Sequence, residues 1–296
     1  MNTIPNKAAV FILLGQSNAV GDSTPMTEED KITKPMKNVF GLHRNPNQTF
    51  DSESLVWSGY MSSGMNLAEE QDHTYSLANC LADLWQNEID NGNKNLPDLY
   101  IIQIAIGAQG ITNGYMWNPE YEKTLIPGKL GEVKISLFSF TQHILSMLSD
   151  SLKDCGITDA KYALHWRGGE NDTSVTQEEL CLSLKNTYNQ LFDMFYASIG
   201  QKVPLTLHKH LCFDRCTQLF PENMWQEKRA RLHHINQVFE ELCEENKNIE
   251  IFDASNAPHY IPDVPGNGIF IDDWVHYNSE TNYWVAKEIM KGFQKD

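Results

Sequence analysis

Five short, largely apolar stretches recur along the chain, and longer segments separate them. An apolar run of about four to eight residues bounded by turn residues is typical of a buried strand. One such run ends abruptly at Gly15, and another ends at Ala105. We therefore expect five strands, at residues 8–14, 99–105, 162–166, 203–207 and 249–253.

The intervening segments show apolar residues at helical spacing, which predicts amphipathic helices. We expect these helices at residues 75–89, 132–152, 176–197, 221–245 and from 279 onward. Strands that alternate with helices predict a mainly parallel sheet with helices on both faces. The expected fold class is therefore α/β, a three-layer α/β/α sandwich with a mainly parallel five-stranded sheet. Residues 1–296 are expected to form a single domain, because no internal repeat or linker interrupts the pattern.

Residues 22–65 are rich in proline, asparagine, serine, threonine and charge, and only residues 39–42 form an apolar run. We interpret this segment as a long connecting excursion. Long loops in compact domains are often functional. Trp57 and Tyr60 could therefore line a substrate pocket, and the alternative is that they anchor a surface loop.

The chain is acidic, with a formal net charge of −16 and a pI of about 5.0. This charge argues against binding to nucleic acid and favours a neutral or cationic partner. Residues 1–8 lack the basic region and cleavage site of a secretory signal, and the apolar run that follows is too short to span a bilayer. We expect a cytoplasmic protein without a membrane partner.

The six cysteines lack the short, regular spacings of a disulfide scaffold or a zinc site. The nearest approach to a metal site is His208, His210, Cys212 and Cys216, because alternate residues of a strand share one face. Cys212 and Cys216 have no second ordered pair, however, and ordinary polar loop residues are the favoured interpretation. No metal and no cofactor are expected.

The sequence Gly-Gln-Ser-Asn at residues 15–18 follows the first expected strand. In an open α/β sheet, ligands bind beyond the carboxyl ends of the strands, so Ser17 is placed where a catalytic nucleophile is needed. Its own backbone N–H could also stabilise an oxyanion, because the first N–H groups of a helix are unpaired. The alternative is an ordinary strand-to-helix turn with a capping serine.

Asp273 and His276 lie close together near the other end of the chain. A serine hydroxyl needs a base to take its proton, and an imidazole base works best when a carboxylate orients it. This spacing indicates that Asp273 and His276 complete a triad with Ser17. Two further segments, residues 104–112 and 166–172, are expected to form loops at strand ends near the same site.

These four blocks, in this order, resemble the SGNH hydrolases, and within them the sialate O-acetylesterase-like group that includes carbohydrate esterase family six. The match is good at GQSN, AIG and DWVHYN. The resemblance implies a flavodoxin-like fold, Ser17 as the nucleophile, and Asp273 and His276 as its triad partners. It also implies an oxyanion hole formed by Ser17, Gly107 and Asn171. The resemblance further implies that the acyl group of the substrate is acetyl and that the alcohol is a carbohydrate hydroxyl.

The third block departs from the group, because Gly168 stands where the group usually has a glutamine. This change puts the Asn171 donor in question. Candidates for substrate binding near the motifs are Gln16, Asn18, Arg167 and Glu170. The arginine could orient an anionic sugar group or form an internal salt bridge. The glutamate could be taken for the acid of a glycosidase, although a paired carboxylate is hard to find in the sequence.

The sequence therefore predicts a serine esterase that removes O-acetyl or other short acyl groups from a carbohydrate through a Ser-His-Asp triad. Its substrate would be a small-molecule or oligosaccharide ester. Two alternatives remain open: an acyltransferase that uses the same triad, and a carbohydrate-binding protein with weakened catalysis. The sugar, the acylated hydroxyl position and the oligomeric state are not determined by the sequence.

Overall fold

The structure is a computed structural model that describes residues 6–22, 24–42, 55–62, 74–121, 136–172, 177–211, 222–262, 264–271 and 275–295. Within these ranges it leaves out the side chains of residues 177–181, 222, 224, 225, 228 and 265.

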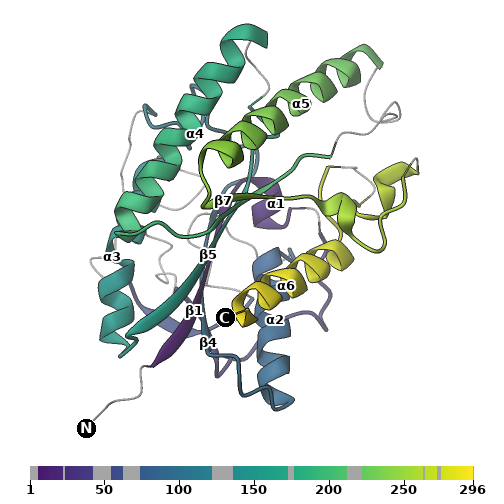
Figure 1. Ribbon diagram of the computed structural model, residues 1–296. Coiled ribbons are helices and arrows are strands. Elements are labelled where there is room, and N and C mark those ends of the chain that lie inside the picture. Colours follow the sequence, from purple (N-terminus) through teal and green to yellow (C-terminus); the bar gives the residue numbers. More distant parts are fainter. Residues whose placement is uncertain are drawn as a thin grey trace.

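The centre of the fold is a seven-stranded sheet with the order β3-β2-β4-β1-β5-β6-β7 (Figure 1). All neighbouring strands are parallel except β3, which is antiparallel to β2. The strands are β1 (Lys7–Gly15), β2 (Val39–Leu42), β3 (Trp57–Gly59), β4 (Asp98–Ala105), β5 (Asp159–Arg167), β6 (Leu205–His208) and β7 (Ile249–Phe252).

The five expected strands are present, but the expected number was too low. The two additional strands, β2 and β3, form one edge of the sheet and belong to the segment that the sequence indicated was a connecting excursion. Both strands are short, so their periodicity is weak. Trp57 lies in β3, packs edge-on against Tyr100 and donates to the Ser151 hydroxyl at 2.7 Å. With Tyr60 also buried, these aromatics anchor the sheet edge.

Helices cover both faces of the sheet, as the alternating pattern predicted (Figure 1). On one face, α3, α4 and α5 pack in succession, and on the other face α2 packs against α6. None of these helices, over the residues described, is long and apolar enough to cross a membrane. The helices are α1 (Ser17–Val20), α2 (Leu77–Asp90), α3 (Leu137–Asp154), α4 (Gln177–Ile199), α5 (Glu222–Glu245) and α6 (Ser279–Gln294).

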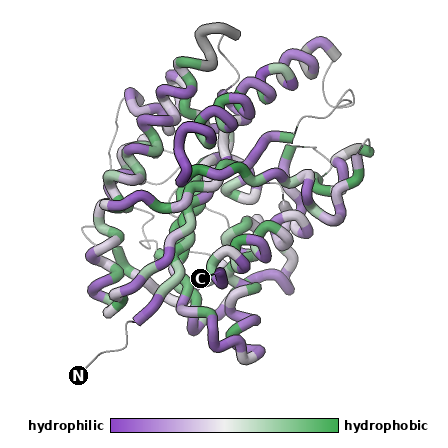
Figure 2. Tube along the Cα trace, in the orientation of Figure 1, coloured by the Kyte–Doolittle hydropathy of each residue, from purple (hydrophilic) through white to green (hydrophobic). Residues whose placement is uncertain are grey.

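The central strand β1 contributes side chains to both apolar layers. Val10, Ile12 and Leu14 pack with the α3, α4 and α5 side, whereas Phe11 and Leu13 pack with the α2 and α6 side. All five are fully buried. This explains the continuous apolar run, because a parallel strand covered on both faces has no solvent-facing positions. Figure 2 shows the same pattern as green strands in the middle of the molecule.

Candidate active site

Ser17 is the first residue of the short helix α1, directly beyond the carboxyl end of β1. Gly15 has φ 142°, and a Cβ atom there would lie 1.9 Å from the Arg167 carbonyl oxygen, so only glycine fits. The turn closes at Gly21, which has φ 85° and donates its N–H to the Ser17 carbonyl at 2.9 Å. Two glycines therefore hold the serine at the edge of the sheet where ligands bind in such folds.

The side chain of Asn18 links this turn to the segment around His276. Its Oδ1 accepts the Tyr277 N–H at 3.1 Å, and its Nδ2 donates to the Val275 carbonyl at 3.1 Å. The same Nδ2 donates to Glu170 Oε1 at 2.9 Å. The Asn18 side-chain amide, on the residue that follows Ser17, thus holds the peptide groups on both sides of His276. Both of its donor hydrogens are used within the protein, which makes Asn18 a positioning residue rather than a free substrate-binding group.

His276 is half-buried, and Asp273 lies outside the described residues. Another carboxylate, Asp22, is close to the histidine and was missed by the sequence reasoning. Burial raises the pKa of the Asp22 carboxyl above its ordinary value, and the nearby His276 imidazole partly opposes this rise. The Asp22 N–H also donates to the Ser17 carbonyl at 3.0 Å. The predicted nucleophile and base therefore belong to one neighbourhood.

Gly107 and Asn171 are half-buried residues of two loops that Asp172 joins. The buried Asp172 Oδ1 accepts the N–H groups of Ile111 at 2.7 Å and Thr112 at 3.0 Å, and the Thr112 hydroxyl at 3.2 Å. This aspartate fixes the loop after β4 to the loop after β5, on which both expected oxyanion donors lie. No sequence pattern indicates this role for Asp172, although it directly follows Asn171 in the third block.

The close contact between these loops demands a glycine at position 110. A Cβ atom on Gly110 would lie 2.2 Å from Asp172 Oδ1. Burial raises the pKa of Asp172 to about 6, and the hydrogen bonds from Ile111 and Thr112 oppose this rise. The folded chain therefore binds the Asp172 proton more tightly than the unfolded chain does.

This raised pKa predicts a pH-dependent stability. The contribution of Asp172 is fully present below its ordinary pKa of 3.8 and is lost as pH rises through about 6. Relative to an Asp172→Asn variant, the wild type should lose up to about 3 kcal/mol of unfolding free energy between about pH 4 and pH 7. Urea unfolding of both proteins at the two pH values measures this. A difference that is independent of pH would contradict it.

Arg167 is fully buried beneath the nucleophile turn, at the end of β5. Its Nη1 donates to the Asn18 carbonyl at 3.3 Å and to Asn282 Oδ1 at 2.7 Å, and its guanidinium lies 4.8 Å from the centroid of the Tyr277 ring. Burial lowers its pKa to about 10. These contacts tie α1, α6 and the residue after His276 together, and they leave the guanidinium inside the protein rather than at a sugar-binding surface.

The same arginine determines the protonation of two buried histidines. Its Nε donates to His208 Nδ1 at 3.3 Å, so that nitrogen must be an acceptor. His208 Nε2 then carries the proton and donates to His165 Nδ1 at 2.9 Å. Burial lowers the pKa of both imidazoles, to about 3 for His165, and both are neutral. Neutral rings are the form that can lie beside a buried cation.

The two histidines considered as metal ligands have different partners. His208 faces His165 and Arg167, whereas His210 packs against Phe239 and lies 3.7 Å from Glu170 Oε1 through its Nδ1. Cys212 and Cys216 are outside the described residues. No group of three or more histidine, cysteine, aspartate or glutamate side chains is arranged to hold a metal in the part of the chain that the structure describes.

Two remaining substrate candidates lie at the junction of the motifs. Gln16 is 2% exposed, and its backbone N–H donates to the Arg167 carbonyl at 2.9 Å. Glu170 accepts a hydrogen bond from Asn18 through Oε1, whereas its buried Oε2 has no hydrogen-bond partner among the residues that the structure describes. Gln16 Oε1 is likewise buried without a hydrogen-bond partner among the described residues, so both side chains keep an acceptor atom for a ligand.

Gly168, the departure from the group pattern, is packed against Trp166. A Cβ atom at this position would lie 3.0 Å from the indole ring, and the indole Nε1 donates to the Gly168 carbonyl at 3.0 Å. Trp166 in turn packs edge-on against Trp117. A glutamine at position 168 would therefore require the Trp166 ring to move.

No protein-family model and no curated protein sequence matches this chain. Among solved structures, NanS matches with a TM-score of 0.59 at 14% identity, over 99% of this chain and 100% of NanS. A protein from Arabidopsis thaliana matches with a TM-score of 0.54 at 14% identity, over 98% of each chain. The chain therefore shares its fold with these two structures. Est24, a carbohydrate acetylesterase from Sinorhizobium meliloti, matches with a TM-score of 0.47 at 12% identity, over 96% of this chain and 99% of Est24.

The contacts of Asn18 predict that its loss impairs turnover more than substrate binding. In Asn18→Leu the peptide groups beside His276 lose their partner, and a displacement of about 1 Å at a catalytic group can cost about a hundredfold in rate. We expect kcat to fall by about that factor, with a small change in KM. Steady-state kinetics with p-nitrophenyl acetate measures the effect.

A matched control for this variant is Asn38→Leu. Asn38 also makes a half-buried amide contact, to Asp98 Oδ1 at 2.8 Å, but on the β2 edge of the sheet. Each variant leaves polar groups unpaired and should lose about 1–3 kcal/mol of stability per group. Equal losses of kcat in the two folded variants would contradict a positioning role for Asn18.

Proposed function

We propose that this protein is a serine esterase that removes O-acetyl or other short acyl groups from a carbohydrate, with Ser17 as nucleophile and His276 as base. The observation that supports this best is the Asn18 amide, which bonds to the peptide groups on both sides of His276. Through it, the turn that carries Ser17 and the turn that carries the base form one unit, although they lie at opposite ends of the chain.

In the proposed reaction, His276 takes the Ser17 proton as the serine oxygen attacks the ester carbonyl. The oxyanion is held by the N–H groups of Ser17 and Gly107 and by the Asn171 side-chain amide. His276 then gives the proton to the departing sugar oxygen, which leaves an acyl group on Ser17. Water attacks this acyl-enzyme with His276 again as base, and the acid and free Ser17 are regenerated. Asp273 orients the imidazole and offsets its transient charge.

The proposal is tested by reacting the purified protein with a serine-directed phosphonate and mapping the modified peptide by mass spectrometry. In parallel, acetate release is measured from p-nitrophenyl acetate and from mono-O-acetylated sugars. We expect one label, on Ser17, and acetate release that the label abolishes. Modification elsewhere without loss of activity, or no acetate release from any ester, would refute the proposal.

The same measurements separate the two alternatives. An acyltransferase would transfer acetyl to an added sugar acceptor in preference to water, which chromatography of the products detects. A binding protein with weakened catalysis would bind acetylated sugars without releasing acetate.

A further inference from the structure

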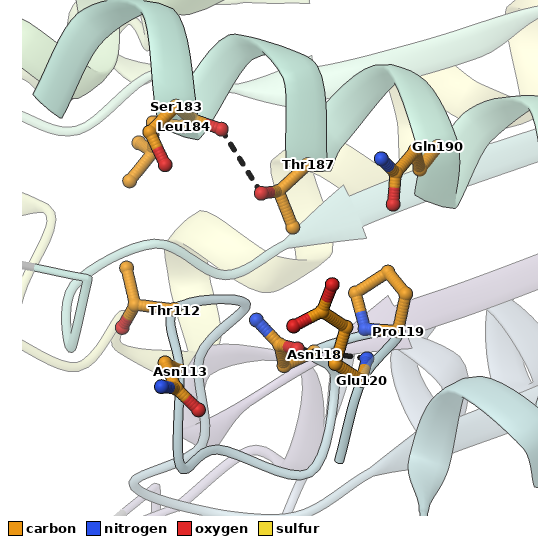
Figure 3. Close-up of a pocket in the computed structure, with 9 residues that line it drawn as sticks. All are labelled: Thr112, Asn113, Asn118, Pro119, Glu120, Ser183, Leu184, Thr187 and Gln190. Atoms are coloured by element: carbon orange, nitrogen blue, oxygen red, sulfur yellow. Dashed lines mark hydrogen bonds between the residues drawn. The ribbon is translucent and has the colours of Figure 1, made fainter. Parts of the chain in front are cut away.

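A pocket of about 360 Å³ lies between the loop that follows β4 and the helix α4 (Figure 3). Its volume is within the range of about 300–1,000 Å³ that is usual for small-molecule sites. Figure 3 shows the loop residues on one side and the helix residues on the other. The described lining residues are Thr112, Asn113, Asn118, Pro119, Glu120, Ser183, Leu184, Thr187 and Gln190.

The lining combines side-chain amides, hydroxyls and one carboxylate, which can accept or donate hydrogen bonds to adjacent hydroxyl groups. Several of these groups are already held in place. Asn118 Nδ2 donates to the Ile111 carbonyl at 2.7 Å, and Asn118 Oδ1 accepts the Glu120 N–H at 2.8 Å. On the helix, the Thr187 hydroxyl donates to the Ser183 carbonyl at 2.9 Å, which leaves its oxygen lone pairs as acceptors.

Both walls of this pocket contact Asp172, the residue after Asn171. The loop wall does so through Thr112, whose N–H and hydroxyl donate to Asp172 Oδ1 at 3.0 and 3.2 Å. The helix wall does so through Tyr188, which follows Thr187 in the sequence. The Tyr188 hydroxyl lies 3.5 Å from Asp172 Oδ2. The loop and the helix that form the pocket walls are therefore both bonded to the aspartate that joins the two loops of the expected oxyanion hole.

The loop wall is also fixed to the nucleophile strand. Trp117, next to Asn118, donates its indole N–H to the Gly15 carbonyl at 2.9 Å. Gly15 directly precedes the turn that places Ser17. Anything bound between the loop and α4 is thus held by elements that contact both the nucleophile turn and the Asn171 loop.

We propose that this pocket is a subsite for an uncharged sugar ring of the ester substrate. The proposal rests on the proposed function. It adds where the alcohol part of the ester binds and which class of sugar that alcohol is. The carboxylate of Glu120 and the net charge of −16 both disfavour an acidic sugar there. Amide and hydroxyl groups set around a small cavity suit the several hydroxyls of a neutral ring.

The test uses two tryptophan substitutions on adjacent exposed positions of α4. Gln190→Trp places an indole at the pocket, whereas Asn189→Trp, the matched control, places it outside the described lining. The substrates are a mono-O-acetylated neutral disaccharide and p-nitrophenyl acetate, which has no sugar. For Gln190→Trp we expect KM for the disaccharide ester to rise at least tenfold, with kcat/KM for p-nitrophenyl acetate within twofold of the wild type. Asn189→Trp should change neither.

An unchanged KM for the disaccharide ester in Gln190→Trp would overturn the subsite, and so would equal losses with both substrates. A lower wild-type KM for an acetylated acidic sugar than for the neutral ester would overturn the choice of an uncharged ring. These results differ from failure of the proposed function, in which the wild type hydrolyses neither ester. In that case calorimetric titration with the unacetylated disaccharide still decides: binding lost in Gln190→Trp and kept in Asn189→Trp supports the subsite, and any other result overturns it.

Discussion

Replacing Ser17 with alanine should abolish esterase turnover, with a loss of about a millionfold in kcat, as when a serine nucleophile is removed from a triad. The variant lacks the oxygen that forms the covalent intermediate. Its fold should persist, because the turn is closed through the Ser17 backbone carbonyl, which accepts the N–H groups of Gly21 and Asp22 at 2.9 and 3.0 Å. Alanine retains both of these bonds.

The measurement is acetate release by wild type and Ser17→Ala at equal concentration, with circular dichroism and thermal unfolding as controls for the fold. Binding of a neutral disaccharide should be the same in both proteins, which separates loss of chemistry from loss of the pocket. A folded Ser17→Ala protein with wild-type turnover would eliminate the serine mechanism.

Replacing Asn171 with alanine should slow turnover by about two to three orders of magnitude with a modest change in KM. An oxyanion donor acts when charge develops, so its removal raises the barrier by about 3 kcal/mol without a matching loss of ground-state binding. Asn171 lies between Glu170, which bonds to Asn18, and Asp172, which holds the loop after β4. Its backbone is therefore anchored on both sides, as a preorganised donor requires.

Asn189→Ala, an exposed amide on α4, is the control for this variant and should retain full turnover. Near-normal kcat in a folded Asn171→Ala protein would refute the donor role. The variant Gly168→Gln is a second test of the expected oxyanion hole. The contact with Trp166 leads us to expect lower stability and no gain in kcat, whereas a gain would show that the hole lacks a donor that a glutamine at this position provides.

The sequence by itself determined the fold class and indicated where the candidate site lies. The apolar run of β1 is read directly, because a strand buried on both faces needs apolar residues at every position. The glycines at 15 and 21 identified the turn, since their positive φ angles are costly for other residues. The pairing of Ser17 with His276 came from residue types and family resemblance. The role of Asp273 stays a prediction, because this residue lies outside the described part of the chain.

The tertiary structure decided the roles of the polar residues around the site. Asn18, Arg167 and Asp172 have no periodicity that reveals their function, because a buried polar group is defined by its hydrogen-bond partners, and these come from other elements. The Asn18 amide meets Glu170 and the peptides beside His276, and Asp172 meets Ile111 and Thr112. The short strands β2 and β3, which end one side of the sheet, escaped the prediction for a related reason. Short strands depend on pairing with their neighbours, and local sequence does not specify that pairing.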